Sequence, residues 1–124
     1  MQNLLERHPK NISDTPVPIH ADPNITNFIL SENQLYIVDW DDIRLSDPMR
    51  DIGQFLYNFV SEENWISFFN AYSLDLNTER KQRIFWWVAA MKLFVGLWFY
   101  LYQDDADKYI EYLEESIAVR EKCL

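Results

Sequence analysis

The feature that most constrains this chain is an apolar run from residue 84 to residue 102, interrupted by one charge at Lys92. A run of this length forms either a membrane-spanning helix or a helix at the centre of a protein core. In a span, a central lysine would cost about 2.5–3.5 kcal/mol on insertion scales. Both flanks have the pattern of ordinary amphipathic helices. We therefore expect a central helix that is buried on most sides, and no membrane partner.

Apolar residues recur at intervals of three and four on both sides of this run, as they do in amphipathic helices. One helix is expected after Pro48, which suits a first turn, with Asp47 or Ser46 available as its cap. A second is expected around residues 65–72, and polar residues 77–79 mark the start of the next. The last is expected within residues 104–123. The periodic positions are Ile52, Phe55, Leu56, Phe59 and Val60, then Trp65, Phe68, Phe69 and Tyr72, and finally Tyr109, Tyr112, Leu113 and Ile117.

A β-hairpin is expected between residues 28 and 40, before the helices. Its two apolar runs are rich in the β-branched and aromatic residues that strands prefer, and Ser31-Glu32-Asn33 between them is typical of a turn. Because side chains alternate along a strand, Asp39 would end the apolar face formed by Leu35 and Ile37. A carboxylate in that position needs a partner to justify its burial.

A hairpin followed by three or four helices is an α+β fold dominated by helix. The chain has 124 residues, which is enough for one core of ordinary size, so we expect a single domain over residues 1–124. Before the hairpin we expect a short helical turn at Leu4 and Leu5, followed by a proline-bearing loop from residue 8 to residue 18.

Charge and cysteine content narrow the classes of partner. The 20 acidic and 11 basic residues give a formal charge of -9, which repels nucleic acids and favours metal ions or cationic small molecules. Cys123 is the only cysteine, so no internal disulfide can form, and the N-terminal sequence lacks the apolar run of a signal peptide. We expect a cytoplasmic protein that does not bind nucleic acid.

Three polar residues around the hairpin suggest chemistry. Asp22 lies in the loop before it, Asn27 at the entrance to its first strand and Asp39 at the end of its second. We expect them to converge at one end of the hairpin. Phosphoryl transfer needs a carboxylate that orients or deprotonates the acceptor hydroxyl, and oxygen ligands for magnesium. Magnesium takes few protein ligands and keeps water and phosphate as the rest. These three side chains supply the required groups.

Each of these residues also has a simpler structural explanation. Asp22 could form a turn beside Pro23. Asn27 could bond to neighbouring backbone, and Asp39 could cap a strand. The spacing of all three together favours a site. The expected solvent-facing or capping residues are Asp42, Arg44 and Asp47.

The ordered set His20, Asp22, Asn27, Asp39, Trp40, Asp41, Asp47, Pro48 and Asp51 matches a family signature. That signature runs His-x-Asp, four residues, Asn, then a strand ending in Asp-Trp or Asp-Phe and an acid, then Asp-Pro and a further Asp. The chain thus resembles the phosphotransferases that include aminoglycoside phosphotransferases and the choline and ethanolamine kinases, which are similar to protein kinases in fold. The resemblance is specific over roughly residues 17–60.

The resemblance implies an ATP- and Mg²⁺-dependent kinase that phosphorylates a hydroxyl of a small cationic molecule, similar to choline, ethanolamine or an aminoglycoside. Asp22 would be the catalytic base or the residue that orients the hydroxyl. Asn27 and Asp39 would bind magnesium, and Asp41 is a candidate ligand of a second metal ion.

The resemblance further implies that His20 and Asp51 support the catalytic loop structurally. Relatives often have glycine where this chain has Ala21 and Thr26, so the loop has less backbone freedom here.

Kinases of this kind hold the nucleotide with a preceding lobe that contains a flexible loop and a lysine. No such elements are found here, because the only glycines, Gly53 and Gly96, fall in helical segments. We expect a C-terminal lobe alone. The alternative is a non-catalytic module that associates with itself through the apolar face around the hairpin.

Overall fold

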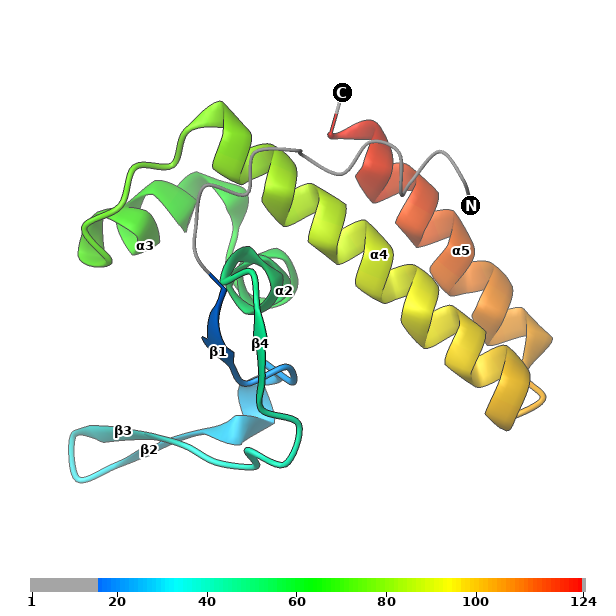
Figure 1. The fold of residues 1–124 in the computed structure, drawn as a ribbon, viewed down its shortest axis with the longest axis horizontal. Coiled ribbons are helices and arrows are strands. Elements are labelled where there is room, and N and C mark those ends of the chain that lie inside the picture. Colours follow the sequence, from blue (N-terminus) through cyan, green and yellow to red (C-terminus); the bar gives the residue numbers. More distant parts are fainter. Residues whose placement is uncertain (1–15, 124) are drawn as a thin grey trace. The chain divides into compact units, whose positions relative to one another are not determined.

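The computed structural model describes residues 16–123 (Figure 1). The helical turn expected at Leu4 and Leu5, and the loop as far as residue 15, lie outside the described residues. Within them the fold is the predicted helix-dominated α+β arrangement, with two small antiparallel sheets and four α-helices. The described residues form two compact units, one of residues 16–76 and one of residues 77–123.

The first unit contains both sheets. Strands β2 (Phe28–Ser31) and β3 (Gln34–Ile37) form the predicted hairpin, with Phe28 opposite Ile37 and Ser31 opposite Gln34. Strands β1 (Val17–Ile19) and β4 (Arg44–Ser46) pair with each other and were not predicted, because the prolines before the hairpin indicated a loop. The β1–β4 pair joins the segment before the hairpin to the segment after it, so it holds together the two ends of residues 20–43.

A short 3₁₀ helix, η1 (Ile25–Asn27), leads into β2, and its N-terminus is capped by Asn24, whose side-chain oxygen accepts from Thr26 N at 3.1 Å. Helix α2 (Met49–Phe59) follows β4. The carboxylate of Asp47 accepts a hydrogen bond from Met49 N at 2.9 Å, so it binds the first turn of α2, although the N-cap position itself is Pro48.

The hairpin is attached to α2 at its base, where the rings of Phe28 and Phe55 lie 5.0 Å apart. After α2 come the 3₁₀ helix η2 (Glu62–Asn64) and helix α3 (Trp65–Ala71). Trp65 and Phe69 are buried, and the indole of Trp65 donates to Val60 O at 3.0 Å. The helices predicted from the intervals of three and four are thus confirmed in this unit.

The second unit is a helical hairpin of α4 (Thr78–Tyr102) and α5 (Ala106–Glu121). The two helices approach closely at Gly96, where an added Cβ would lie 2.9 Å from Cβ of Tyr112. The buried hydroxyl of Ser116 donates to Ala89 O at 2.8 Å. Lys92, the one charge in the apolar run, forms an ion pair with Glu115 on α5. The ion pair with α5 therefore explains how a charged side chain is accommodated within the apolar run of α4.

The prediction that this apolar helix is buried on most sides was wrong. Only 28% of the most apolar 18-residue window of α4 is buried, and exposed aromatic residues include Phe94, Trp98 and Tyr102. By length and composition alone α4 could cross a membrane, but core helices of water-soluble proteins pass the same test of length and hydropathy.

On α5, the predicted apolar position Ile117 is exposed, and the buried residues are Ser116 and Val119.

Candidate active site

The backbone of Val38 connects the loop that carries Asp22 to the segment that carries Asp39. Its N–H donates to Asn27 O at 3.0 Å, and its carbonyl oxygen lies 2.7 Å from Nε2 of His20. Because a carbonyl can only accept, His20 must carry its proton on Nε2. Its Nδ1 is then free to accept from Asp22 N, at 3.3 Å. The buried imidazole therefore links the loop to the residue just before Asp39.

Asp22 and Asn27 are in direct contact. Nδ2 of Asn27 donates to the Asp22 carboxylate at 3.1 Å and to the Asp22 carbonyl at 3.0 Å. Asn27 is buried, whereas Asp22 is exposed and can be reached by a substrate hydroxyl. Since the amide nitrogen faces Asp22, the amide oxygen is the end of the side chain left for a metal ligand. The structure thus brings these two predicted site residues together.

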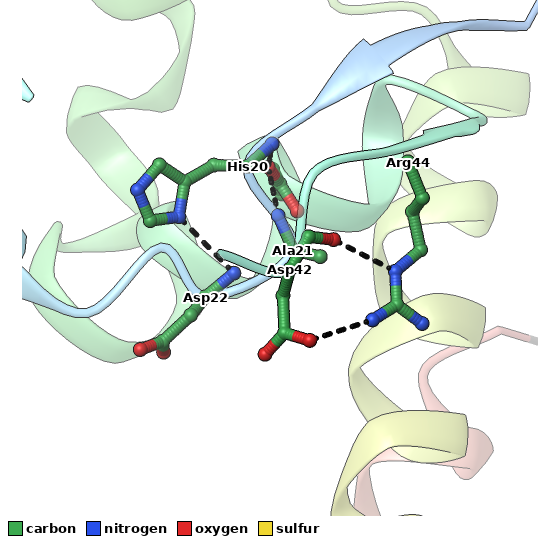
Figure 2. Close-up of polar contacts among 6 residues, drawn as sticks. His20, Ala21, Asp22, Asp42 and Arg44 are labelled. Carbon is green, nitrogen blue, oxygen red and sulfur yellow. Dashed lines mark hydrogen bonds and ion pairs between the residues drawn. The ribbon is translucent and has the colours of Figure 1, made fainter. Parts of the chain in front are cut away.

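Asp51 holds the backbone of the same loop. Its Oδ2 accepts hydrogen bonds from His20 N at 2.7 Å and from Ala21 N at 3.0 Å. Ala21 has a φ of 72°, in the left-handed region that L-residues avoid at a cost of about 1–2 kcal/mol. Figure 2 shows the loop backbone at His20 and Ala21, with the Asp22 carboxylate pointing away from it. His20 and Asp51 therefore lie where a supporting role requires them.

The position of Asp39 differs from the prediction. Strand β3 ends at Ile37, and Asp39 lies beyond it with a φ of 65°, so strand alternation does not reach it. Its side chain is exposed rather than buried on an apolar face. Among the described residues it has no hydrogen-bond or ion-pair partner, and the same is true of the exposed Asp41. Both carboxylates are therefore available to a cation.

Trp40 covers the histidine, a contact that the sequence did not predict. Its ring centroid lies 4.7 Å from that of His20 with the planes tilted by 57°, and its indole N–H donates to Ile37 O at 2.7 Å.

Asp42 and Arg44, which follow shortly after Trp40, form an exposed ion pair in which Nη2 of Arg44 lies 3.2 Å from Oδ1 of Asp42 (Figure 2). This pair matches the expected solvent-facing role of both residues.

Arg50 is the cation nearest in sequence to Asp51. Burial, and secondarily the charge of Arg44, lower the pKa of Arg50 more than the nearby Asp51 and Asp42 raise it. The guanidinium stays charged at neutral pH despite this decrease, because the ordinary pKa of arginine lies far above neutrality. Arg50 therefore keeps its positive charge in the first turn of α2.

The polar side chains of this site suit a magnesium ion that takes some of its ligands from the protein and others from phosphate oxygens. In the described part of the chain no group of three histidine, cysteine, aspartate or glutamate side chains could hold a metal by itself. Magnesium does not need such a group, because it commonly takes one or two carboxylates plus water and phosphate oxygens. The carboxylate of Asp39, which has no partner among residues 16–123, and the amide oxygen of Asn27 are ligands of this kind.

Comparison with known proteins identifies the family. The model of the phosphotransferase enzyme family matches residues 1–85. The crystal structure of a choline/ethanolamine kinase family protein from Mesorhizobium loti is similar over 98% of this chain, with a TM-score of 0.75 and 19% sequence identity. This chain spans 45% of the length of that protein. Since the family match covers more than half of its residues, the chain belongs to the phosphotransferase enzyme family.

Proposed function

We propose that this chain supplies the catalytic acid and the metal ligands of an ATP- and Mg²⁺-dependent phosphotransferase acting on a hydroxyl of a small cationic molecule. The observation that carries the proposal is the contact between Asn27 and the exposed Asp22 carboxylate, in a loop tied through Val38 to Asp39. The match to the phosphotransferase enzyme family over residues 1–85 supports the transfer of a phosphoryl group. Because the chain spans less than half of the solved relative, it would act as the C-terminal lobe of a larger catalytic unit.

In this proposal Asp22 receives or orients the proton of the acceptor hydroxyl. The amide of Asn27 directs one carboxylate oxygen of Asp22, which leaves the other for the substrate. Asn27 and Asp39 would hold magnesium, which would neutralise charge on the transferred phosphoryl group when bound. Asp41, two residues after Asp39, is the proposed ligand of a second ion.

The acidic surroundings support a cationic acceptor. The exposed carboxylates of Asp22, Asp39 and Asp41 belong to a chain with a formal charge of -9. Such a field favours an acceptor that carries a positively charged amine over an anionic acceptor. A solved relative is a member of the choline/ethanolamine kinase family, a name that agrees with an acceptor bearing an amine.

The alternative is a non-catalytic module that acts through self-association. One observation favours it: Leu30 and Leu35, which are paired across the hairpin, are 72% and 62% exposed. Exposed apolar surfaces of this kind often mark interfaces. In that case the purified chain would dimerise and would transfer no phosphate.

The test compares two aspartate variants of the purified chain, and of any longer polypeptide that contains it. Phosphate transfer from ATP is measured with choline, ethanolamine and an aminoglycoside as acceptors. Asp22→Asn should lower kcat at least 100-fold, because general base catalysis contributes about 10²–10⁴-fold. Asp42→Asn, which changes an exposed aspartate paired with Arg44, should leave kcat within twofold. An Asp22→Asn protein that keeps more than a tenth of the activity contradicts the proposal.

A further inference from the structure

Exposed apolar side chains of α4 form a stripe on the side of the helix that faces away from α5. Figure 1 shows α5 running along one side of α4, and Ala89, Lys92 and Gly96 mark that side by their contacts with α5. Phe94 and Trp98 lie two residues before and after Gly96, so both point about 160° away from it around the helix. Their side chains are 61% and 43% exposed. The stripe is therefore an outer surface of the α4–α5 hairpin.

The stripe has the spacing of a helix that packs against a partner helix. Its intervals alternate between three and four residues, so the average period is about 3.5, as in coiled coils. No member is charged, and Leu101 at its end is 66% exposed. Ile84 would extend the stripe towards the N-terminus, but it is already buried within the chain. We define the α4 seam as the partly or fully exposed positions Trp87, Met91, Phe94, Trp98 and Leu101.

The two ends of α4 carry opposite charge. Residues 79–83, at its N-terminal end, contain three basic residues and one acidic residue. Residues 104–107, just beyond its C-terminal end, contain three acidic residues and no basic residue. An antiparallel pair of α4 helices places the basic end of each beside the acidic end of the other, whereas a parallel pair places like charges together. The basic residues are Arg80, Lys81 and Arg83, and the acidic residues are Asp104, Asp105 and Asp107.

The α4 seam also matches itself in the antiparallel direction. When the basic end of one copy lies beside the acidic end of another, Met91 lies opposite Phe94 of the second copy, and Trp87 lies opposite Trp98. This register has twofold symmetry, so both copies use the same surface and the pair closes on itself. The apolar spacing and the charges at the helix ends therefore select the same arrangement.

We propose that the α4 seam is an interface between two copies of this chain, which form a closed dimer of antiparallel α4 helices. Five side chains are fewer than the roughly 20–30 residues that a standard interface takes from each partner, so the dimer should dissociate at micromolar concentrations. A membrane is a poorer occupant, because the aspartates beyond α4 repel anionic lipid headgroups. The seam lies in residues 77–123 and the candidate site in residues 16–76, so the inference goes beyond the proposed function and does not rest on it.

The test is sedimentation velocity of the full 124-residue chain over a range of micromolar concentrations. The wild type should show a monomer–dimer equilibrium. Phe94→Ser/Trp98→Ser, which removes the centre of the α4 seam, should raise the dissociation constant at least tenfold. Ile110→Ser/Ile117→Ser removes two exposed apolar side chains from α5 and should associate as the wild type does. Circular dichroism verifies that each variant is folded.

A second control separates this interface from the β2–β3 hairpin, which also exposes apolar side chains. Leu30→Ser/Leu35→Ser should associate as the wild type does, because both substitutions lie outside α4. Loss of the dimer in this variant, with association retained in Phe94→Ser/Trp98→Ser, would overturn the inference and place the interface at the hairpin.

Charge reversal tests the antiparallel direction. Arg80→Glu/Lys81→Glu makes both ends of α4 acidic, and Asp104→Lys/Asp107→Lys makes both ends basic. Each of these variants should raise the dissociation constant at least fivefold. A chain with all four substitutions again has ends of opposite charge, so it should associate more tightly than either. Association that is no tighter in the fourfold variant would contradict the antiparallel arrangement.

Two further results would overturn the inference. The first is a monomer at all concentrations, either in the wild-type chain or in a longer polypeptide that contains it. The second is a wild-type chain that remains monomeric alone and floats with phosphatidylcholine vesicles, with loss of this binding in Phe94→Ser/Trp98→Ser. That result would identify a lipid surface as the occupant of the α4 seam.

Discussion

The side-chain amide of Asn27 donates a hydrogen bond to the carboxylate of Asp22 at 3.1 Å. The same nitrogen also donates to the Asp22 carbonyl, so the bonds fix both the backbone and the side chain of the candidate catalytic residue. Asn27 lies five positions after Asp22 in the sequence, and η1 brings the two residues together. The geometry of this loop therefore depends on the Asn27 amide, whose nitrogen donates to Asp22 and whose oxygen is the proposed ligand of magnesium.

Asn27→Asp should destabilise the protein by about 1.5–3 kcal/mol, the range for a hydrogen bond to a charged group, because a donor facing Asp22 becomes a second carboxylate. Urea denaturation followed by circular dichroism measures the change. Asn33→Asp, in the exposed hairpin turn, should change the stability by less than about 0.5 kcal/mol. If the two variants change the free energy of unfolding equally, the contact between Asn27 and Asp22 does not stabilise the protein.

His20→Phe should reduce the free energy of unfolding by about 1–3 kcal/mol. Phenylalanine can keep the ring contact with Trp40, but it leaves Val38 O and Asp22 N without the imidazole. Tyr36→Phe is the control, since it removes an exposed bond to Gln34 and should cost less than about 0.5 kcal/mol. If His20→Phe is as stable as the wild type, the imidazole bonds do not hold the loop.

Ala21→Gly should stabilise the protein slightly, by up to about 1 kcal/mol. The left-handed φ of Ala21 costs an L-residue about 1–2 kcal/mol, whereas glycine loses about 0.5–1 kcal/mol in additional backbone entropy. Ala71→Gly, at an exposed helical position in α3, should destabilise instead. Thermal unfolding of the two variants should therefore shift in opposite directions, and a decrease in both would contradict the assigned backbone conformation.

Gly96→Ala should destabilise the α4–α5 hairpin even though alanine favours helix. Overpacking costs about 1–3 kcal/mol, and the new Cβ would lie 2.9 Å from Cβ of Tyr112, against a helix-propensity gain of about 1 kcal/mol. Glu114→Ala, at an exposed position on α5, should be nearly neutral. A Gly96→Ala protein that gains stability would mean that the two helices separate easily at this point.

Much of the fold could be predicted from local patterns. The period-two run before residue 38 and the three- and four-residue spacing of Ile52, Phe55 and Leu56 report local backbone geometry, and the hairpin and helix α2 follow from them. The β1–β4 pair could not be predicted in this way. Its strands have three residues each, one contains Pro18, and their pairing spans a long stretch of sequence.

The candidate site was predictable in its residue types but not in its backbone. The carboxylate and amide of Asp22 and Asn27 are visible in the sequence, and their contact follows from their spacing. The turn at Asp39 is not visible, because a positive φ in an aspartate leaves no pattern in the neighbouring residues. For the same reason the bonds to the backbone of Val38 could not be anticipated, since any residue supplies the same N–H and carbonyl.

The most direct test of the central claim is whether a divalent ion binds beside Asn27 and Asp39. Mn²⁺, a paramagnetic substitute for Mg²⁺, is titrated into isotope-labelled chain, and the broadening of the Asn27 side-chain NH₂ signal is followed by NMR. The proposed site predicts selective broadening of that signal, and at least tenfold weaker binding in Asp39→Asn but unchanged binding in Asp42→Asn. Unchanged binding in Asp39→Asn, or broadening confined to the acidic residues of α5, would contradict the assignment of this site.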